Sequence, residues 1–291
     1  MKPPVFDYVA PGSLDEALEL LAEHGDDAKI LAGGQSLIPL MNFRLAQPAL
    51  LVDLNGLDEL AGVRADDEGR LRIGGMTRQR TLERDPLVAE RSPLLAETIP
   101  FVAHPQIRNR GTVGGNLAHA DPASELPVVA VALGAELVLK NKERERTVGA
   151  EDFFVGLMTT ALEPCEILVE AVFPAAPPRT GTSFMEVSRR HGDYAQCGVA
   201  ATVSADESGA VVAARLVFLS VGEIPMRARR AEEVLAVEPD WDRAVAAAAA
   251  LAAEEEIEPT DDIHASAAFK RHLAGVLTRR ALETARARAV A

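Results

Sequence analysis

The sequence predicts an α+β fold, and three observations lead to this prediction. Residues 1–55 alternate buried-strand patterns with helical periodicity, which indicates a small α/β unit. Residues 56–176 combine hairpin-forming strands with helical stretches. Residues 177–291 place strand-like segments before charged and alanine-rich helical ones, which predicts a small antiparallel sheet packed under helices. We therefore expect an N-terminal domain over residues 1–176, with subdomains 1–55 and 56–176, and a C-terminal domain over residues 177–291.

The first unit begins with a helix signal. Ser13 precedes Glu16 by three residues, as in a capping box, and apolar residues follow at helical spacing from Leu14. Gly33 and Gly34 then separate a short apolar run from a second helical pattern. The expected elements are a helix from Leu14, a strand over 29–32, a helix over 36–45 and a strand over 49–54.

The second unit begins with a hairpin signal. Residues 66–69, Asp-Asp-Glu-Gly, have the composition of a tight turn, so strands over 62–65 and 70–75 are expected to pair. The other expected elements are helices over 81–90, 92–102 and 127–133, and strands over 135–140, 146–150 and 167–173.

A proline-rich segment marks the expected domain boundary. Residues 173–181 contain three prolines and a glycine, which disfavour both helix and central strand. Arg227, Arg229 and Arg230 stand where the C-terminal helices begin, and both ordinary solvation and contact with an acidic partner are open for them. The expected elements after the boundary are strands over 182–188, 195–204 and 210–221, then helices from about residue 228.

Composition limits the functions that this chain can have. The formal net charge of -14 repels a phosphate backbone, which argues against nucleic-acid binding. Cys165 and Cys197 are the only cysteines and lie in no metal-binding pattern, so we expect neither a metal site nor an iron–sulfur cluster in this chain. Residues 244–253, the longest apolar run, are too few to span a bilayer, and no signal peptide is evident, so a cytoplasmic location is expected.

A first glycine-rich loop reads Ala32-Gly33-Gly34-Gln35-Ser36 and lies between an expected strand and an expected helix. Helix N-termini offer free N–H groups to anions, and glycines let a backbone turn sharply and approach a ligand. The loop matches neither the G-x-G-x-x-G pattern of dinucleotide folds nor a P-loop. From these residues alone, an anion site and a tight structural turn both remain open.

A second glycine-rich loop, Thr112-Val113-Gly114-Gly115-Asn116, repeats this composition. Main-chain N–H groups from two such loops can surround a pyrophosphate without any lysine. Asp121 and Glu125 follow, and two interpretations of them are open. They can accept hydrogen bonds from ribose hydroxyls, or they can cap the next helix and fill its first turn.

Several motifs in order along the chain resemble the FAD-binding medium subunit of molybdenum hydroxylases, the carbon monoxide dehydrogenase and xanthine dehydrogenase type. The resemblance covers nearly the whole chain. It implies a two-subdomain FAD-binding fold of the vanillyl-alcohol oxidase and PCMH-like type, followed by a flavoprotein C-terminal domain. The motifs that carry it are A-G-G-Q-S-L at 32–37, R-N-R-G-T-V-G-G-N at 108–116, A-D-P-A-S-E at 120–125, S-R-R-H-G-D-Y-A at 188–195 and D-I-H-A-S-A at 262–267.

The resemblance also implies which residues hold the cofactor. Both glycine loops would bind the FAD pyrophosphate, and Glu125 would contact its adenosine side. Main chain at Leu168 or Val169 would lie near the flavin. Tyr194 would cover one flavin face by stacking, although a domain-interface aromatic is the alternative. The cofactor-binding residues expected in this way are Ala32, Gly33, Gly34, Gln35, Ser36, Leu37, Thr112, Gly114, Gly115, Asn116, Asp121, Glu125, Leu168 and Tyr194.

The function implied is an electron-transfer subunit with FAD as its cofactor and no catalytic residue of its own. Molybdopterin is expected on a large partner subunit and 2Fe–2S clusters on a small one, in a dimer of heterotrimers. Gln35 replaces a histidine common in carbon monoxide dehydrogenases, and Met185 a lysine frequent in xanthine-type members, so the substrate and the electron acceptor stay open. A self-sufficient FAD-dependent oxidoreductase and a cofactor-free binding module are the alternatives.

Overall fold

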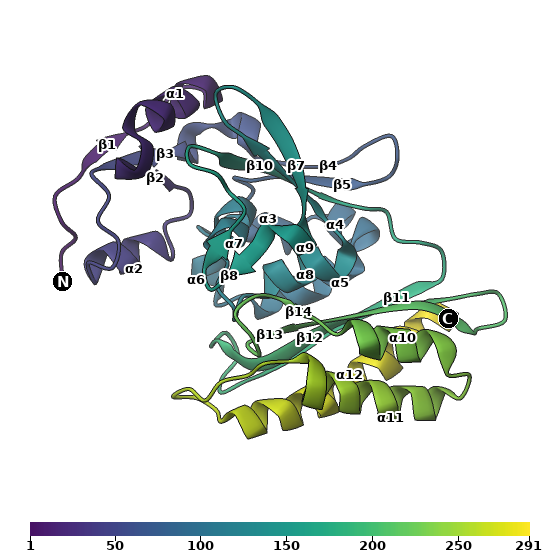
Figure 1. Ribbon diagram of the computed structural model, residues 1–291. Coiled ribbons are helices and arrows are strands. Elements are labelled where there is room, and N and C mark those ends of the chain that lie inside the picture. The colour runs from purple at the N-terminus through teal and green to yellow at the C-terminus, as the bar shows by residue number, and fades with distance from the viewer.

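The computed structural model describes all 291 residues, and its first unit is a three-stranded parallel sheet in the order β1-β3-β2 (Figure 1). The hydroxyl oxygen of Ser13 accepts a hydrogen bond of 3.2 Å from the N–H of Glu16, so helix α1 begins where the sequence predicts. β1 was not predicted, because its exposed residues have no apolar pattern. The elements are β1 (Asp7–Val9), α1 (Leu14–His24), β2 (Ala28–Leu31), α2 (Leu37–Asn42) and β3 (Leu50–Asp53), with 3-10 turns at Gly25–Asp27, Leu54–Gly56 and Asp58–Leu60.

The second unit contains a five-stranded antiparallel sheet in the order β4-β5-β10-β6-β7. Its edge hairpin β4–β5 confirms the pairing predicted from the Asp-Asp-Glu-Gly turn. The strands are β4 (Val63–Ala65), β5 (Leu71–Gly74), β6 (Glu136–Lys140), β7 (Glu145–Gly149) and β10 (Ile167–Phe173), beside a small hairpin of β8 (Phe154–Gly156) and β9 (Thr159–Thr160).

Short helices cover one face of this sheet. The helix predicted over 81–90 is broken, because Pro86 cannot continue it, and Asp85 instead caps a new helix by accepting from the N–H of Leu87 at 2.9 Å. The second glycine-rich loop also differs from expectation, since most of it forms helix α7. The helices are α3 (Gln79–Leu82), α4 (Pro86–Arg91), α5 (Pro93–Thr98), a 3-10 turn (Ile99–Phe101), α6 (Pro105–Arg108), α7 (Val113–His119), α8 (Glu125–Leu133) and α9 (Ala150–Phe153).

The C-terminal part is an antiparallel sheet with helices α10, α11 and α12 on one face (Figure 1). On its other face, Phe184, Ala200 and Val217 share one buried core with α8, which lies between the two large sheets. These features confirm the α+β fold class. The elements are β11 (Thr180–Ser188), β12 (Ala195–Ala205), β13 (Val211–Leu219), β14 (Met226–Arg227), α10 (Arg229–Val237), α11 (Trp241–Leu251), a π-helical turn (Ala252–Glu256) and α12 (Ala267–Val290).

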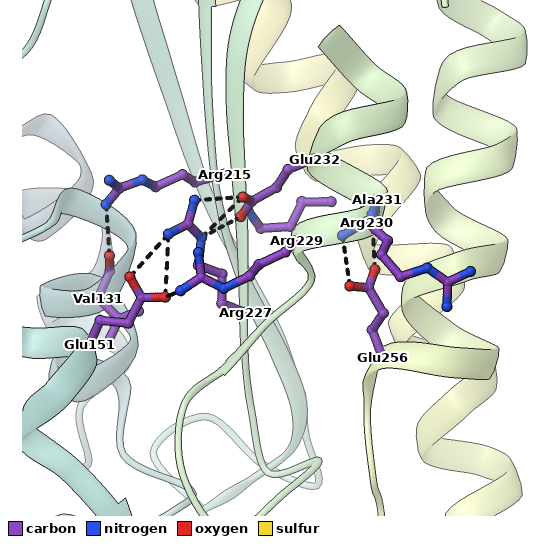
Figure 2. A network of polar contacts seen from close by, with 10 residues as sticks. Val131, Glu151, Arg215, Arg227, Arg229, Arg230, Ala231, Glu232 and Glu256 are labelled. Carbon is purple, nitrogen blue, oxygen red and sulfur yellow. Dashed lines mark hydrogen bonds and ion pairs between the residues drawn. The ribbon is translucent and has the colours of Figure 1, made fainter. Parts of the chain in front are cut away.

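The arginines before and within α10 pair inside the chain (Figure 2). Arg227 binds both carboxylate oxygens of Glu232 and also reaches Glu151 of α9, at 3.1 Å from its Oε2. Arg229 also contacts Glu151, and Glu256 accepts from the N–H of Arg230 at 2.8 Å. Arg227 and Arg229 therefore join the two domains, and an acidic partner is not needed to explain them.

Candidate cofactor site

A cavity of about 1140 Å³ lies where both N-terminal units meet the loop between β11 and β12. This volume slightly exceeds the range of roughly 300–1,000 Å³ for ligand pockets, so the cavity can hold a large ligand. Every residue predicted to bind the cofactor lines this one cavity: Ala32, Gly33, Gly34, Gln35, Ser36, Leu37, Thr112, Gly114, Gly115, Asn116, Asp121, Glu125, Leu168 and Tyr194.

The first glycine loop gives the cavity a row of free donors. The backbone N–H groups of residues 33–37 have no acceptor within the chain, although all these residues line the cavity. Ser36 is the N-cap of α2, but its hydroxyl makes no capping hydrogen bond and so remains available. Gln35 folds back, donating from Nε2 to the carbonyl of Gly33 at 3.0 Å. Successive unpaired N–H groups form a concave anion site.

The glycines allow backbone to pack on backbone. A Cβ on Gly33 would lie 2.5 Å from the carbonyl oxygen of Arg110, and one on Gly114 would lie 2.8 Å from that of Gly75. A Cβ on Gly75 would in turn lie 2.2 Å from the carbonyl oxygen of Leu168. Glycine is therefore required at these positions for close approach between chain segments.

The second glycine loop offers fewer free main-chain donors than the sequence predicts, because most of its N–H groups already have partners within the chain. The N–H of Gly114 donates to the carbonyl of Gly75 at 2.8 Å, and those of Gly115 and Asn116 donate to Thr112, at 3.1 Å each. The cause is helix α7, because Thr112 caps it and uses these N–H groups. The first loop is thus the main source of main-chain donors.

The two acidic residues have different surroundings. One carboxylate oxygen of Asp121 accepts from the N–H of Ala123 at 2.9 Å, so Asp121 caps a turn, whereas Ser124 is the N-cap of α8. Glu125 is the first residue of α8 and is 6% exposed. Burial raises the pKa of Glu125 to about 7, and the negative charge of Asp121 adds to this effect.

Tyr194 lies at the rim of the cavity and is 65% exposed. Loss of water around its hydroxyl raises the pKa of Tyr194, as do the charges of Asp121 and Glu125. Its loop rests on His104, because a Cβ on Gly192, where φ is +87°, would lie 2.4 Å from that imidazole.

Sequence reasoning missed several residues that line the cavity. They come from loops far apart in the chain, and of the four named below only His264 lies in a quoted motif, D-I-H-A-S-A at 262–267. Met158 and Cys165 adopt positive φ values of 49° and 67° without being glycine, which no residue pattern predicts. The additions include His104, Met158, Cys165 and His264.

No helix in the structure is long and apolar enough to cross a membrane.

Two family models match the chain. Residues 4–176 match the FAD binding domain in molybdopterin dehydrogenase, and residues 182–285 match the CO dehydrogenase flavoprotein C-terminal domain.

Similar proteins cover the full length. The 6-hydroxypseudooxynicotine dehydrogenase complex subunit alpha of Paenarthrobacter nicotinovorans is 43% identical over 99% of this chain and 97% of that protein. The caffeine dehydrogenase subunit beta of Pseudomonas sp. (strain CBB1) is 42% identical over 100% and 98%. A solved structure of carbon monoxide dehydrogenase from Hydrogenophaga pseudoflava superposes with a TM-score of 0.95 at 41% identity, covering 99% of each chain.

These matches confirm the resemblance, the FAD cofactor and the role as a subunit of an oxidoreductase complex. Contact between FAD and each individual residue stays a prediction. The chain belongs to the FAD-binding medium subunits of the molybdenum hydroxylases.

Proposed function

We propose that this cavity holds FAD and that the chain passes electrons through it within a molybdenum hydroxylase complex. The observation that carries the proposal is the row of unpaired N–H groups at residues 33–37 on the cavity wall. Backbone donors of this kind stabilise anions without lysine, so they would bind the pyrophosphate. The free hydroxyl of Ser36 would add a further donor.

Other residues would place the rest of the cofactor. Asp121 and Glu125 would lie near its sugar hydroxyls, and Asn116 would offer its amide nitrogen, since its Oδ1 already accepts from Ser124 at 2.8 Å. The backbone around Leu168 would approach the flavin beside Gly75. Tyr194 at the rim would stack on one face of the ring and limit access of water and oxygen.

FAD supplies the redox chemistry, because it can exchange electrons with both one-electron and two-electron partners. We propose that electrons leave substrate at a molybdenum centre on a large subunit, pass through two 2Fe–2S clusters on a small subunit and reach this cavity. An external acceptor would then take them. The scarcity of cysteine in this chain supports placing the clusters on a partner.

The exposed rim supports an approach by those partners. Met158 lines the cavity and is 45% exposed, so it offers apolar surface to a partner. We further propose a dimer of heterotrimers located in the cytoplasm. Size-exclusion chromatography with light scattering of the native complex would test the stoichiometry.

The function is tested by following flavin reduction in the purified complex and in the isolated chain loaded with FAD. A screen would include carbon monoxide and N-heterocycles such as caffeine, which the names of the relatives suggest. We expect a substrate to bleach the flavin only in the complex. Bleaching in the isolated chain would support a self-sufficient oxidoreductase, and failure to bind FAD in both would support a cofactor-free module.

A further inference from the structure

Glu125 has an uncommon position for an acidic residue. It lines the cavity at the start of α8, yet only 6% of it is exposed. Its own N–H is the one hydrogen-bond donor that the chain gives to its carboxylate. An acid that is buried with so few donors has little to stabilise its charged form.

Glu186 lies on strand β11, near enough for the charge of Glu125 to act on it. It pairs with Gly198 of β12, and it shares the face of the sheet that carries Phe184 toward α8. Its Oε2 atom is buried and has no hydrogen-bond partner. Glu186 does not line the cavity, so a ligand there cannot supply the missing donor.

The cations around these acids are either paired with other acids or exposed to solvent. Arg189, Arg190 and His191, which follow β11, are exposed. The charge of Arg108 in α6 lowers the pKa of Glu125, but its effect is smaller than those of burial, of the Glu125 N–H and of the charge of Asp121. The guanidinium of Arg108 is already bound to Glu83 at 3.0 Å. On the elements packed against β11, Lys270 pairs with Asp262 at 2.6 Å, and Arg288 pairs with Glu97 at 2.6 Å beside Thr182.

The other charges that act on these two acids are negative. Asp121 and Tyr194 face Glu125, and ionised Glu125 in turn acts on Glu186. Burial raises the pKa of Glu125 to about 7, and burial together with the charge of Glu125 raises that of Glu186 to about 8.

We propose that Glu125 and Glu186 form a proton-holding pair in the cavity wall, so that Glu125 presents an O–H donor, not a carboxylate, up to neutral pH. The two protons leave to solvent one after the other, because an ionised Glu125 disfavours ionisation of Glu186. Glu186 is a positioning residue, since it acts through Glu125. The part of this inference that concerns FAD rests on the proposed function.

The pair has a consequence for an anionic ligand. A neutral Glu125 does not repel a pyrophosphate, and it can donate a hydrogen bond to a ligand oxygen. A dianion that binds nearby makes ionisation of Glu125 less favourable, so binding takes up a fraction of a proton from solvent.

Infrared titration of the full-length chain between pH 5 and pH 9 tests the pair. We expect protonated-carboxyl absorption that disappears in two steps, near pH 7 and pH 8. In Glu186→Gln, the protonated-carboxyl absorption should disappear in a single step near pH 7. In Glu125→Gln, the absorption of Glu186 should disappear at a lower pH than in the wild type. Glu207→Gln, on an exposed turn, controls for the substitution itself.

Absence of protonated carboxyl at pH 6.5, or a Glu186 step that stays in place in Glu125→Gln, would overturn the pair. If the variants fold poorly, NMR of the wild-type chain with ¹³C-labelled glutamate tests the same pair. Two side-chain resonances must then titrate above pH 6.

Calorimetry of FAD binding at pH 7.5 in buffers of different ionisation enthalpy tests the link to the ligand. We expect proton uptake in the wild type and less in Glu125→Gln. Binding without any uptake would overturn the placement of Glu125 beside the ligand. If FAD does not bind at all, the proposed function fails while the infrared result on the pair stands.

Discussion

Gly33 lies directly against the backbone of Arg110, since a Cβ on Gly33 would be 2.5 Å from the Arg110 carbonyl oxygen. The same carbonyl accepts a hydrogen bond from the guanidinium of Arg78, which also donates to the side chain of Asn55. Asn55 in turn donates to the carbonyl of Ala32 at 2.8 Å. The loop that carries the free N–H groups is therefore fixed from both sides before any ligand binds.

Gly33→Ala should weaken FAD binding by about tenfold to a hundredfold. The added methyl must displace backbone, and overpacking of this kind costs about 1–3 kcal/mol, where about 1.4 kcal/mol is a factor of ten in affinity. Fluorescence titration with FAD measures the change. Gly56→Ala is the matched control, because no atom lies within 4 Å of its added Cβ. Equal affinity in both variants would contradict the role of this contact.

Tyr194→Ala should change the environment of the flavin without changing the stability of the chain. Tyr194 is 65% exposed, so its removal should alter the free energy of unfolding by no more than about 0.5 kcal/mol. Loss of stacking should increase the fluorescence of bound flavin and speed its oxidation by oxygen. Tyr194→Phe keeps the ring and should behave as the wild type. A flavin unaffected by Tyr194→Ala would favour the interface role instead.

Stability should fall as the pH rises. Folding raises the pKa of Glu125 and Glu186 to about 7 and about 8, so the folded chain binds these protons more tightly than the unfolded chain. Their contribution is complete at low pH and is lost as the pH rises toward 8, at up to about 1.4 kcal/mol per proton for each pH unit. Glu186→Gln removes one such group, so its melting temperature should fall less between pH 5 and pH 9. If the melting temperatures of the wild type and Glu186→Gln fall by the same amount over this pH range, the prediction is wrong.

Arg227→Met should destabilise the junction between the domains by about 3 kcal/mol. The substitution leaves Glu232, which is 7% exposed, without its main cationic partner. Urea unfolding measures the loss. Arg230→Met is the control, because the ion pair of Arg230 with Glu255 is exposed and such pairs contribute about 0–1 kcal/mol. If both variants lose a similar free energy of unfolding, the ion pairs of Arg227 with Glu232 and Glu151 add little stability.

Local sequence signals predicted much of the fold. The Ser13 cap located α1, and the turn at 66–69 predicted the β4–β5 hairpin, because both depend on residues close together in the chain. β1 escaped prediction because Asp7–Val9 is held by β3, more than forty residues away. Helix α7 escaped because two glycines disfavour helix, and close packing of Gly114 on Gly75 overrides that preference.

The sequence likewise predicted the candidate site only in part. The motifs identified residues that all line one cavity, but they did not show which of the N–H groups of these residues are free. Which N–H groups stay free depends on Thr112 capping α7, a property of the folded backbone. Glu186 lies in no motif, and its Oε2 atom loses access to hydrogen-bond partners only when β11 packs into the folded core.

The most direct test of this account is an experimental structure of the chain, within its complex, with FAD bound. We expect pyrophosphate oxygens within hydrogen-bond distance of the N–H groups of residues 33–37, while the N–H groups of residues 114–116 keep their present partners. A pyrophosphate held mainly by residues 114–116, or lying outside this cavity, would contradict it.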